Sequence, residues 1–398
     1  MHRKGGAAVR GVGFVERNGF QTLSKLDDFF KAVGKETMRA VREVYPDVVD
    51  EDAAVTLIAT PDTRHYIDGV DLNVFREAVI QPVRWISDRG GKSWRSYGAL
   101  ACMDVVGGDS RKYVRWLSMP EFMHVGSLIV DDIQDNSLIR RGAPCAHLQY
   151  GQAIAINAGT ASYFQGQQML LVPGMSPEKL NKIYDYYFAA LRAGHAGQGL
   201  DITGLDYLMD DVIARGHSGG AALAESRILA IHRLKTAVPA ASLAKMGAVV
   251  GGGSDAQVKA IGDYYESVGI AFQIMDDVLN LRGIVSTKAD KNAGETLKTL
   301  GEDITAGKVT IPVVKAIGLL PTAEMRALWD VIKTKPKDRA TVDRCIAILE
   351  ACGAVDACVA HAERLVEDSY RALSPFIPDS FSKLMLRAFG WFVIEQSK

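Results

Sequence analysis

The chain has 398 residues, a formal net charge of −1, 48% hydrophobic residues and 23% charged residues. This balance is typical of a globular protein with enough apolar side chains for a large core, and it argues against a nucleic-acid partner. The five cysteines include no CxxC pair, so we expect reduced thiols in a cytoplasmic protein rather than disulfides or a zinc site. No run reaches the roughly 18 consecutive apolar residues of a membrane span, and the basic N-terminus has no apolar signal segment.

Helical spacing of apolar residues dominates most of the chain. Residues 46–71 contain two prolines and predict a connector, with a short β-like run at 54–59. The predicted helices cover residues 23–45, 73–88, 113–135, 182–202 and 259–281. The third of these is expected to bend near Pro120. We therefore predict an all-α fold, with a partly helical N-terminal extension over 1–71 and a large helical bundle over 72–398.

Three aspartates end an apolar predicted helix in the stretch DDIQD. Asp131 and Asp135 are four residues apart and share one helix face, with Asp132 beside them. Carboxylates this close repel one another unless a cation lies between them. A single motif of this kind is as often a solvated helix face as a metal site. The similar pair Asp210 and Asp211 has no acid one turn later, and we interpret it as surface.

A second acidic group lies much later in the chain, inside another apolar helical stretch. It consists of Asp276 and Asp277, with Asn280 one turn further on. Oxygen ligands in a helical bundle favour Mg²⁺ or Mn²⁺, which usually bind through carboxylates and substrate phosphates. Two such groups in one bundle could clamp a diphosphate through bridging metals, and a pair of surface motifs is a poorer explanation of them.

Basic residues near these motifs could hold a diphosphate directly. Lys92 and Arg95 lie in GGKSWRS, where a glycine turn opens a predicted helix, and helix N-termini favour phosphate. Arg140 and Arg141 follow the first acidic motif, and arginine forks match phosphate oxygens. The further candidates are Lys235 beside Thr236, Lys298 and Lys308. Each base alone is most simply a solvated residue, but together they predict two diphosphate sites, one held through metal and one held by basic side chains.

The motifs occur in the order found in the all-trans isoprenyl diphosphate synthases, which the chain resembles over residues 75–395. The matching stretches are GGKSWRS, DDIQDNSLIRRGAPCAH, GQGLD, LKTA, FQIMDDVLN and GEDITAGKVTIP. They most resemble the geranylgeranyl diphosphate synthases of fungi and animals. The resemblance implies a helical bundle of the isoprenoid synthase type with a central active-site cavity. It also implies a homodimer and about three Mg²⁺ ions per active site, which Mn²⁺ can replace.

The activity implied by the resemblance is that of a prenyltransferase. It would condense isopentenyl diphosphate (IPP) with dimethylallyl, geranyl or farnesyl diphosphate, release diphosphate and make mainly geranylgeranyl diphosphate. Metals and cationic side chains would neutralise the leaving diphosphate, so that the allylic substrate ionises and the IPP double bond attacks it.

The resemblance also assigns roles to single residues. The metal ligands would be Asp131, Asp132, Asp135, Asp276, Asp277 and Asn280. The substrate-binding residues would be Arg140, Lys235 and Lys298 for the allylic diphosphate, Lys92, Arg95, His124 and Arg141 for IPP, Thr236 and Gln273 beside the reacting carbons, and Lys308. The catalytic set would be Asp131, Asp132, Asp135, Arg140, Lys235, Thr236, Gln273, Asp276 and Lys298. Without the resemblance, His124 would more often be a core histidine.

Two other functions fit parts of the pattern. A terpene synthase on the same fold ionises a prenyl diphosphate without adding IPP, but it needs no second set of bases. A non-catalytic regulatory subunit would be expected to lose its acidic motifs, and here the first motif is complete. We therefore favour chain elongation over both alternatives.

Two local features lead to further expectations. Asn280 stands where the second motif usually ends in aspartate, so we expect Asn280→Asp to be tolerated or mildly activating. Ser127 and Gly126 are small and lie on the helix face that precedes the first motif, which predicts a tunnel open beyond a C15 product. Met123, one turn deeper, could form the floor of that tunnel, and we expect a C20 product.

Overall fold

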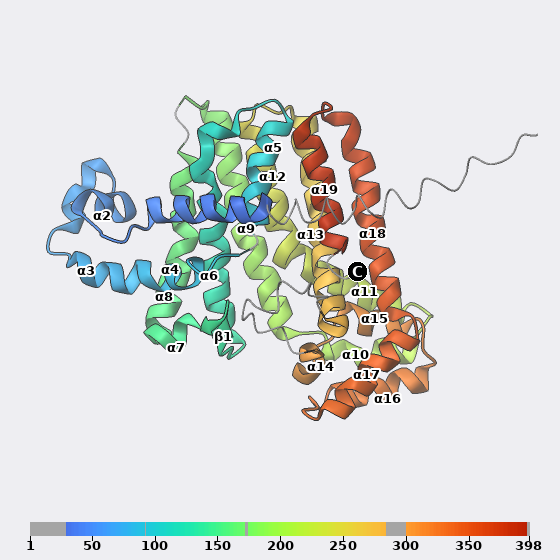
Figure 1. The fold of residues 1–398 in the computed structure, drawn as a ribbon. Helices are drawn as coiled ribbons and strands as arrows, with labels where there is room; N and C mark the ends of the chain where they lie inside the picture. The colour runs from blue at the N-terminus through green and yellow to red at the C-terminus, as the bar shows by residue number, and fades with distance from the viewer. Residues whose placement is uncertain (1–28, 92, 172–173, 284–299, 396–398) are drawn as a thin grey trace, which may run out of the picture. The chain divides into compact units, whose positions relative to one another are not determined.

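A computed structural model describes residues 29–91, 93–171, 174–283 and 300–395. Apart from a two-stranded sheet, the secondary structure of these residues is helical, which confirms the predicted all-α class (Figure 1). The chain divides into two compact units, Met1–Tyr97 with Val114–Ser162, and Gly98–Tyr113 with Tyr163–Lys398. These units do not test the predicted boundary between an N-terminal extension and the helical bundle at residue 71, which stays a prediction.

The first unit begins, among its described residues, with a helix over residues 29–44. Its other elements are α2 (Glu51–Ile58), η1 (Pro61–Ile67), α3 (Leu72–Phe75), η2 (Arg76–Ile80), α4 (Gln81–Ser87), α6 (Ser118–Gln134), β1 (Ile139–Arg140), β2 (Ala143–Pro144), α7 (Ala146–Tyr150) and most of α8 (Gln152–Gln165). Arg84 fastens the first helix to α4, because its buried guanidinium donates to the Tyr45 carbonyl at 2.6 Å and also binds Asp88. The Tyr45 ring in turn meets Phe122 of α6 edge-on, with centroids 4.8 Å apart.

The second unit is built on long helices. Its elements are most of α5 (Trp94–Val105), η4 (Gly166–Leu170), α9 (Pro177–Thr203), α10 (Asp206–Arg215), α11 (Gly220–His232), η5 (Arg233–Ala237), α12 (Val238–Val250), α13 (Asp255–Arg282), α14 (Glu302–Ala306), α15 (Ile311–Ile317), α16 (Thr322–Ile332), α17 (Arg339–Ala351), α18 (Ala354–Leu373), η7 (Ser374–Phe376) and α19 (Phe381–Glu395). Helix α12 packs against α9 and α13, and α13 packs against α18 (Figure 1). The start of α13 is fixed by a capping box, in which Ser254 and Gln257 satisfy each other's backbone N–H groups. The helix ends at Gly283, whose φ of 79° suits glycine.

The predicted long helices are present, with local corrections. The β-like run at 54–59 is wrong, because those residues lie largely in α2, which Asp50 caps by accepting from the Ala53 N–H. The helix predicted from residue 113 begins instead at Ser118, after the 3₁₀ segment η3 (Ser110–Leu117). Pro120 therefore lies in the first turn, where no backbone donor is needed, and it does not have to bend the helix.

Two π-helical segments and one hairpin were not predicted. The segment η2 ends two residues before Pro82, which has no N–H to donate to an ordinary helical turn. The segment η5 contains Lys235 and Thr236. Among the described residues, no single helix has the length and hydropathy to cross a membrane; one pair, Arg339–Ala351 with Ala354–Phe376, passes that test only jointly and is bent by 58°.

Candidate active site

Helix α6 carries the first acidic motif at its C-terminal end. The Asp135 N–H donates to the Asp131 carbonyl at 2.9 Å, so the two residues are one helical turn apart, as predicted. Asp135 is the C-cap residue and is exposed, whereas the Asp131 side chain keeps about a fifth of its surface accessible. Both carboxylates can therefore reach a metal ion from the same end of the helix.

Asp132 faces a different way from its neighbours. Its carboxylate is fully buried and bonds the Arg140 guanidinium, with the Arg140 Nε atom 2.8 Å away. Although burial lowers the pKa of Arg140, the hydrogen bond and charge of Asp132 and the charge of Asp131 raise it overall. Burial and the charge of Asp132 also raise the pKa of the neighbouring Cys145 thiol to about 12. In this arrangement Asp132 holds Arg140, a cation, and is turned away from the open end where Asp131 and Asp135 lie.

Arg140 and Arg141 lie in a tight hairpin and contact different partners. Arg140 pairs with Ala143 across the β1–β2 ladder, and Arg141 and Gly142 form the turn with φ values of 49° and 74°. Positive φ at both central residues is the requirement of a two-residue hairpin turn of type I′. Arg140 lies in β1 and bonds Asp132, whereas Arg141 lies in the turn and contacts other groups.

Arg141 belongs to a second, more buried group in the first unit. Its Nη1 atom donates to the Ile86 carbonyl at 3.2 Å, and its Nη2 atom lies 3.8 Å from Glu121. Burial, then the charges of Arg95, Arg141 and Arg140, lower the pKa of His124 well below its ordinary value. Three of the four predicted IPP residues thus influence one another, and the fourth, Lys92, lies outside the described residues.

The second acidic group lies near the C-terminal end of α13 in the second unit. The Asp277 carboxylate accepts the N–H of Ile311 at 3.0 Å and so caps α15. The Asn280 side chain is buried, and its Oδ1 atom accepts the N–H of Asp303 at 3.2 Å, at the start of α14. Burial and the charge of Asp303 raise the pKa of Asp277 well above its ordinary value. Asp277 and Asn280 therefore fix the chain that follows α13.

Two of the predicted lysines, Lys235 and Lys308, bind the same carboxylate, to which no role was assigned from the sequence. Asp201, near the end of α9, accepts hydrogen bonds from the Nζ atoms of Lys235 at 2.7 Å and Lys308 at 3.2 Å. Burial raises the pKa of Asp201, but the two lysine charges lower it further, so that the net shift is downward. Asp201 is the aspartate of the GQGLD stretch, which is one of the stretches that match the family, so the sequence did contain a signal for this residue. The remaining predicted lysine, Lys298, lies outside the described residues.

The π-helical segment η5 brings Lys235 and the buried Thr236 close to α9. A β-carbon on Gly197 of α9 would lie 2.2 Å from the backbone N of Lys235, so only glycine permits this approach. His232, just before η5, lies 3.8 Å from Asp277, and burial lowers its pKa to about 4. Gln273 is half-buried on α13, one turn before Asp276 and Asp277.

The donor set fits a hard cation that is completed by substrate. Within the described ranges, no three histidine, cysteine or acidic side chains are arranged so that they could hold a metal ion by themselves. Mg²⁺ commonly takes only one or two carboxylates and completes its octahedron with water and substrate phosphates. The acidic side chains of α6 and of α13 are of the kind that Mg²⁺ takes, and among them Asp132, Asp277 and Asn280 already bond an arginine or backbone amides.

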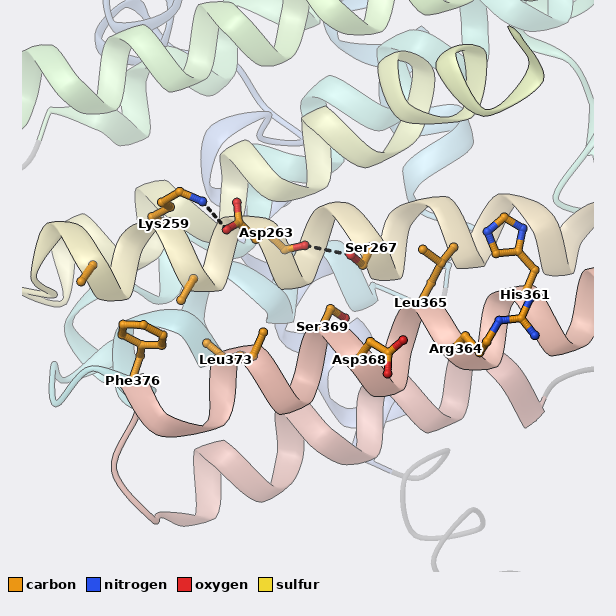
Figure 2. Close-up of a pocket in the computed structure, with 13 residues that line it drawn as sticks. Lys259, Asp263, Ser267, His361, Arg364, Leu365, Asp368, Ser369, Leu373 and Phe376 are labelled. Carbon is orange, nitrogen blue, oxygen red and sulfur yellow. Dashed lines mark hydrogen bonds and ion pairs between the residues drawn. The ribbon is translucent and has the colours of Figure 1, made fainter. Parts of the chain in front are cut away.

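One pocket in the second unit is lined by other residues. It is a groove of about 800 Å³ between α13 and α18, and its lining includes Ser267, Leu365 and Phe376 (Figure 2). Lys259 and Asp263 form an ion pair along its rim, and His361 lies at one end. None of the predicted site residues lines this groove. The candidate site is therefore described by the contacts of its charged side chains and not by this groove.

Known proteins with similar sequences or folds were compared with this chain. The short chain isoprenyl diphosphate synthase of Methanothermobacter thermautotrophicus is 31% identical over 292 residues, covering 73% of this chain and 81% of that protein. The geranylgeranyl diphosphate synthase of Methanosarcina mazei is 29% identical over 280 residues, covering 70% and 78%.

Solved structures give the same result. The geranylgeranyl pyrophosphate synthetase from Pyrococcus horikoshii has a TM-score of 0.72 at 22% identity, covering 95% of this chain and 99% of that chain, which supports the fold. The geranylgeranyl pyrophosphate synthase from Corynebacterium glutamicum, complexed with isoprenyl diphosphate and magnesium, has a TM-score of 0.69 at 25% identity and covers 93% and 99%. Residues 76–349 match the family described as Polyprenyl synthetase. The chain therefore belongs to the polyprenyl synthetase family.

Proposed function

We propose that this protein is a trans-prenyltransferase that condenses IPP with an allylic diphosphate and makes mainly geranylgeranyl diphosphate. The observation that carries the proposal is the divergence of Arg140 and Arg141. Arg140 bonds Asp132 of the first acidic motif, whereas Arg141 lies near Glu121, and its charge helps to lower the pKa of His124. Two separate cationic positions suit two diphosphates, and a terpene synthase would need only the first.

The allylic diphosphate is proposed to bind at the acidic motifs through Mg²⁺. Asp131, Asp135 and Asp276 would hold the ions, about three in number in such a site. The magnesium in the related Corynebacterium glutamicum structure supports this choice of cation. When bound, Mg²⁺ would supply positive charge to the leaving diphosphate.

The side chains of this chain do the remaining work in the proposal. Arg140, Lys235 and Lys308 would donate to the allylic diphosphate, joined by Lys298, and so stabilise charge that develops as the C–O bond breaks. Arg95, Arg141, His124 and Lys92 would hold IPP with its double bond toward the allylic carbon. Thr236 and Gln273 would lie beside the reacting carbons. The released diphosphate would take the final proton, since no carboxylate is assigned as a base.

The proposed C20 product is supported by the names of the relatives and by the small Gly126 on the predicted tunnel face of α6. Several relatives are named as geranylgeranyl diphosphate synthases. On α6, Gly126 and Met123 are both buried, whereas Ser127 is exposed.

A homodimer in the cytoplasm remains part of the proposal. Light scattering should give twice the chain mass of 43.2 kDa, and the chain mass alone would contradict the dimer.

Incubation with labelled IPP and each allylic diphosphate tests the function directly. The protein is supplied with dimethylallyl, geranyl or farnesyl diphosphate and Mg²⁺, and the products are dephosphorylated and sized by mass spectrometry. We expect label to enter a C20 alcohol from all three starters. Unlabelled hydrocarbons or alcohols would support the terpene synthase instead. No reaction in any incubation would support a regulatory subunit.

A further inference from the structure

Glu121 is a buried acid among the residues proposed to hold IPP. It lies on α6, three residues before His124, and only 5% of the residue is exposed. Its Oε2 atom has no hydrogen-bond partner and lies 3.8 Å from the Arg141 Nη2 atom, and the charges of Arg141 and Arg95 both act on the carboxyl. A buried carboxylate normally requires full compensation, because removing it from water costs several kcal/mol. A negative charge beside a diphosphate site is unfavourable unless it serves another group.

The Arg141 guanidinium is restrained on three sides. Its Nη1 atom donates to the Ile86 carbonyl, and its Nη2 atom faces Glu121. A β-carbon on Gly91 would lie 2.8 Å from Nη2, so the glycine leaves the space that the guanidinium occupies. The backbone of Arg141 is itself in the left-handed region, with φ 49°. The contacts that fix this side chain therefore come from α4, α6 and the glycine turn before α5.

We propose that Glu121 is a positioning residue for the IPP diphosphate, acting by holding the Arg141 guanidinium in its binding orientation. This rests on the proposed function, in which Arg141 binds IPP. An arginine offers five N–H groups in a rigid fork. With Nη1 on a carbonyl and Nη2 toward a carboxylate, the orientation of the remaining N–H groups is set before substrate arrives. Glu121 has no contact with the substrate in this role.

Charge and position predict opposite results when Glu121 is neutralised. If Glu121 acted only through its charge, Glu121→Gln would remove a repulsive anion and lower the KM for IPP. If it positions Arg141, the same isosteric change releases the guanidinium and raises that KM. A misplacement of about 1 Å can cost up to about 100-fold, so a rise on the order of tenfold is expected. The KM for farnesyl diphosphate and the kcat at saturation should change less than about twofold.

Gly91→Ala provides a second variant that leaves every charge in place. Its new methyl group would displace the Arg141 guanidinium by contact and not by charge. Because the guanidinium is the end of a flexible side chain, it can move without unfolding the protein. We expect it to raise the KM for IPP selectively, as Glu121→Gln does. Glu121→Asp keeps the charge at a shorter reach and should give an intermediate KM.

The control variant is Glu367→Gln in the second unit. Glu367 is a half-buried acid whose two oxygens accept from Arg387 at 2.6 and 2.8 Å, so its loss reports a generic broken ion pair. Thermal melting confirms that each variant is folded, and the control should keep the wild-type KM for IPP.

The outcomes separate this inference from the function on which it rests. An unchanged or lowered KM for IPP in Glu121→Gln, with a raised KM in Arg141→Ala, overturns the role of Glu121 alone. An unchanged KM for IPP in Arg141→Ala overturns the IPP assignment of Arg141, and the positioning role falls with it.

Discussion

Replacing Asn280 by aspartate tests whether the second acidic motif binds metal at its last position. The sequence alone favoured a tolerated or mildly activating change, since aspartate is the usual residue there. The structure gives Asn280 a different neighbourhood. Its side chain is buried and accepts the Asp303 N–H, and Asp277 lies one turn earlier on the same helix. We therefore now expect Asn280→Asp to destabilise the protein in the absence of metal.

The magnitude follows from the neighbouring charges. Helix positions three apart place their Cβ atoms roughly 5–6 Å apart. Two carboxylates about 6 Å apart repel by about 3 kcal/mol at an effective dielectric constant of about 20. The bond from the Asp303 N–H would become charge-assisted and offset about 1–2 kcal/mol. We expect the free energy of unfolding to fall by about 1–2 kcal/mol at neutral pH.

The pH dependence has a defined sign. Burial and the acids Asp277 and Asp303 would raise the folded-state pKa of the new carboxyl above its unfolded value of about 3.9. Below the unfolded value the carboxyl is protonated in both states, so wild type and variant should be equally stable. The difference should grow as the pH rises to the folded pKa and stay constant above it. Urea unfolding of both proteins, followed by circular dichroism in EDTA between pH 4 and 8, measures it.

Two results would refute this reasoning. Equal stability of the two proteins in EDTA at pH 8 would mean that the new carboxylate is not repelled by its neighbours. Higher prenyltransferase activity together with tighter Mg²⁺ binding in Asn280→Asp would show that position 280 faces the metal, as the sequence suggested. A destabilised variant with unchanged Mg²⁺ dependence is the expected result.

The remaining predictions concern metal, charge and product length. Asp131→Ala should lower the condensation rate by on the order of 10³-fold, and EDTA should abolish wild-type activity; full activity of this variant in chelator would exclude the metal site. Asp201→Asn should raise the KM for the allylic substrate by freeing Lys235, and its stability deficit should fade as the pH falls through the lowered pKa of Asp201, which acid titration of unfolding checks. Gly126→Phe should shorten the product and Met123→Ala should lengthen it, as sized by chromatography; an unchanged distribution from both variants would show that this face does not line the tunnel.

Several features of this protein were determined by local sequence. The 3.6-residue spacing of apolar side chains predicted the long helices, because an amphipathic helix must bury one face. The four-residue spacing of Asp131 and Asp135 placed them one turn apart for the same geometric reason. Asp210 and Asp211 were predicted as surface, and they pair there with Arg326 and Arg215.

Tertiary structure decided which charged groups serve each other. Asp132 and Asp131 are adjacent in sequence, yet Asp132 is buried against Arg140 because a helix turns successive side chains by about 100°. The pairing of Asp201 with Lys235 and Lys308 joins positions far apart in the chain, and no local pattern encodes such a contact. Asn280 likewise depends on an amide supplied by α14. Spacing within one helix fixes direction, but burial and long-range partners fix the charge and role of each group, and those exist only once the chain has folded.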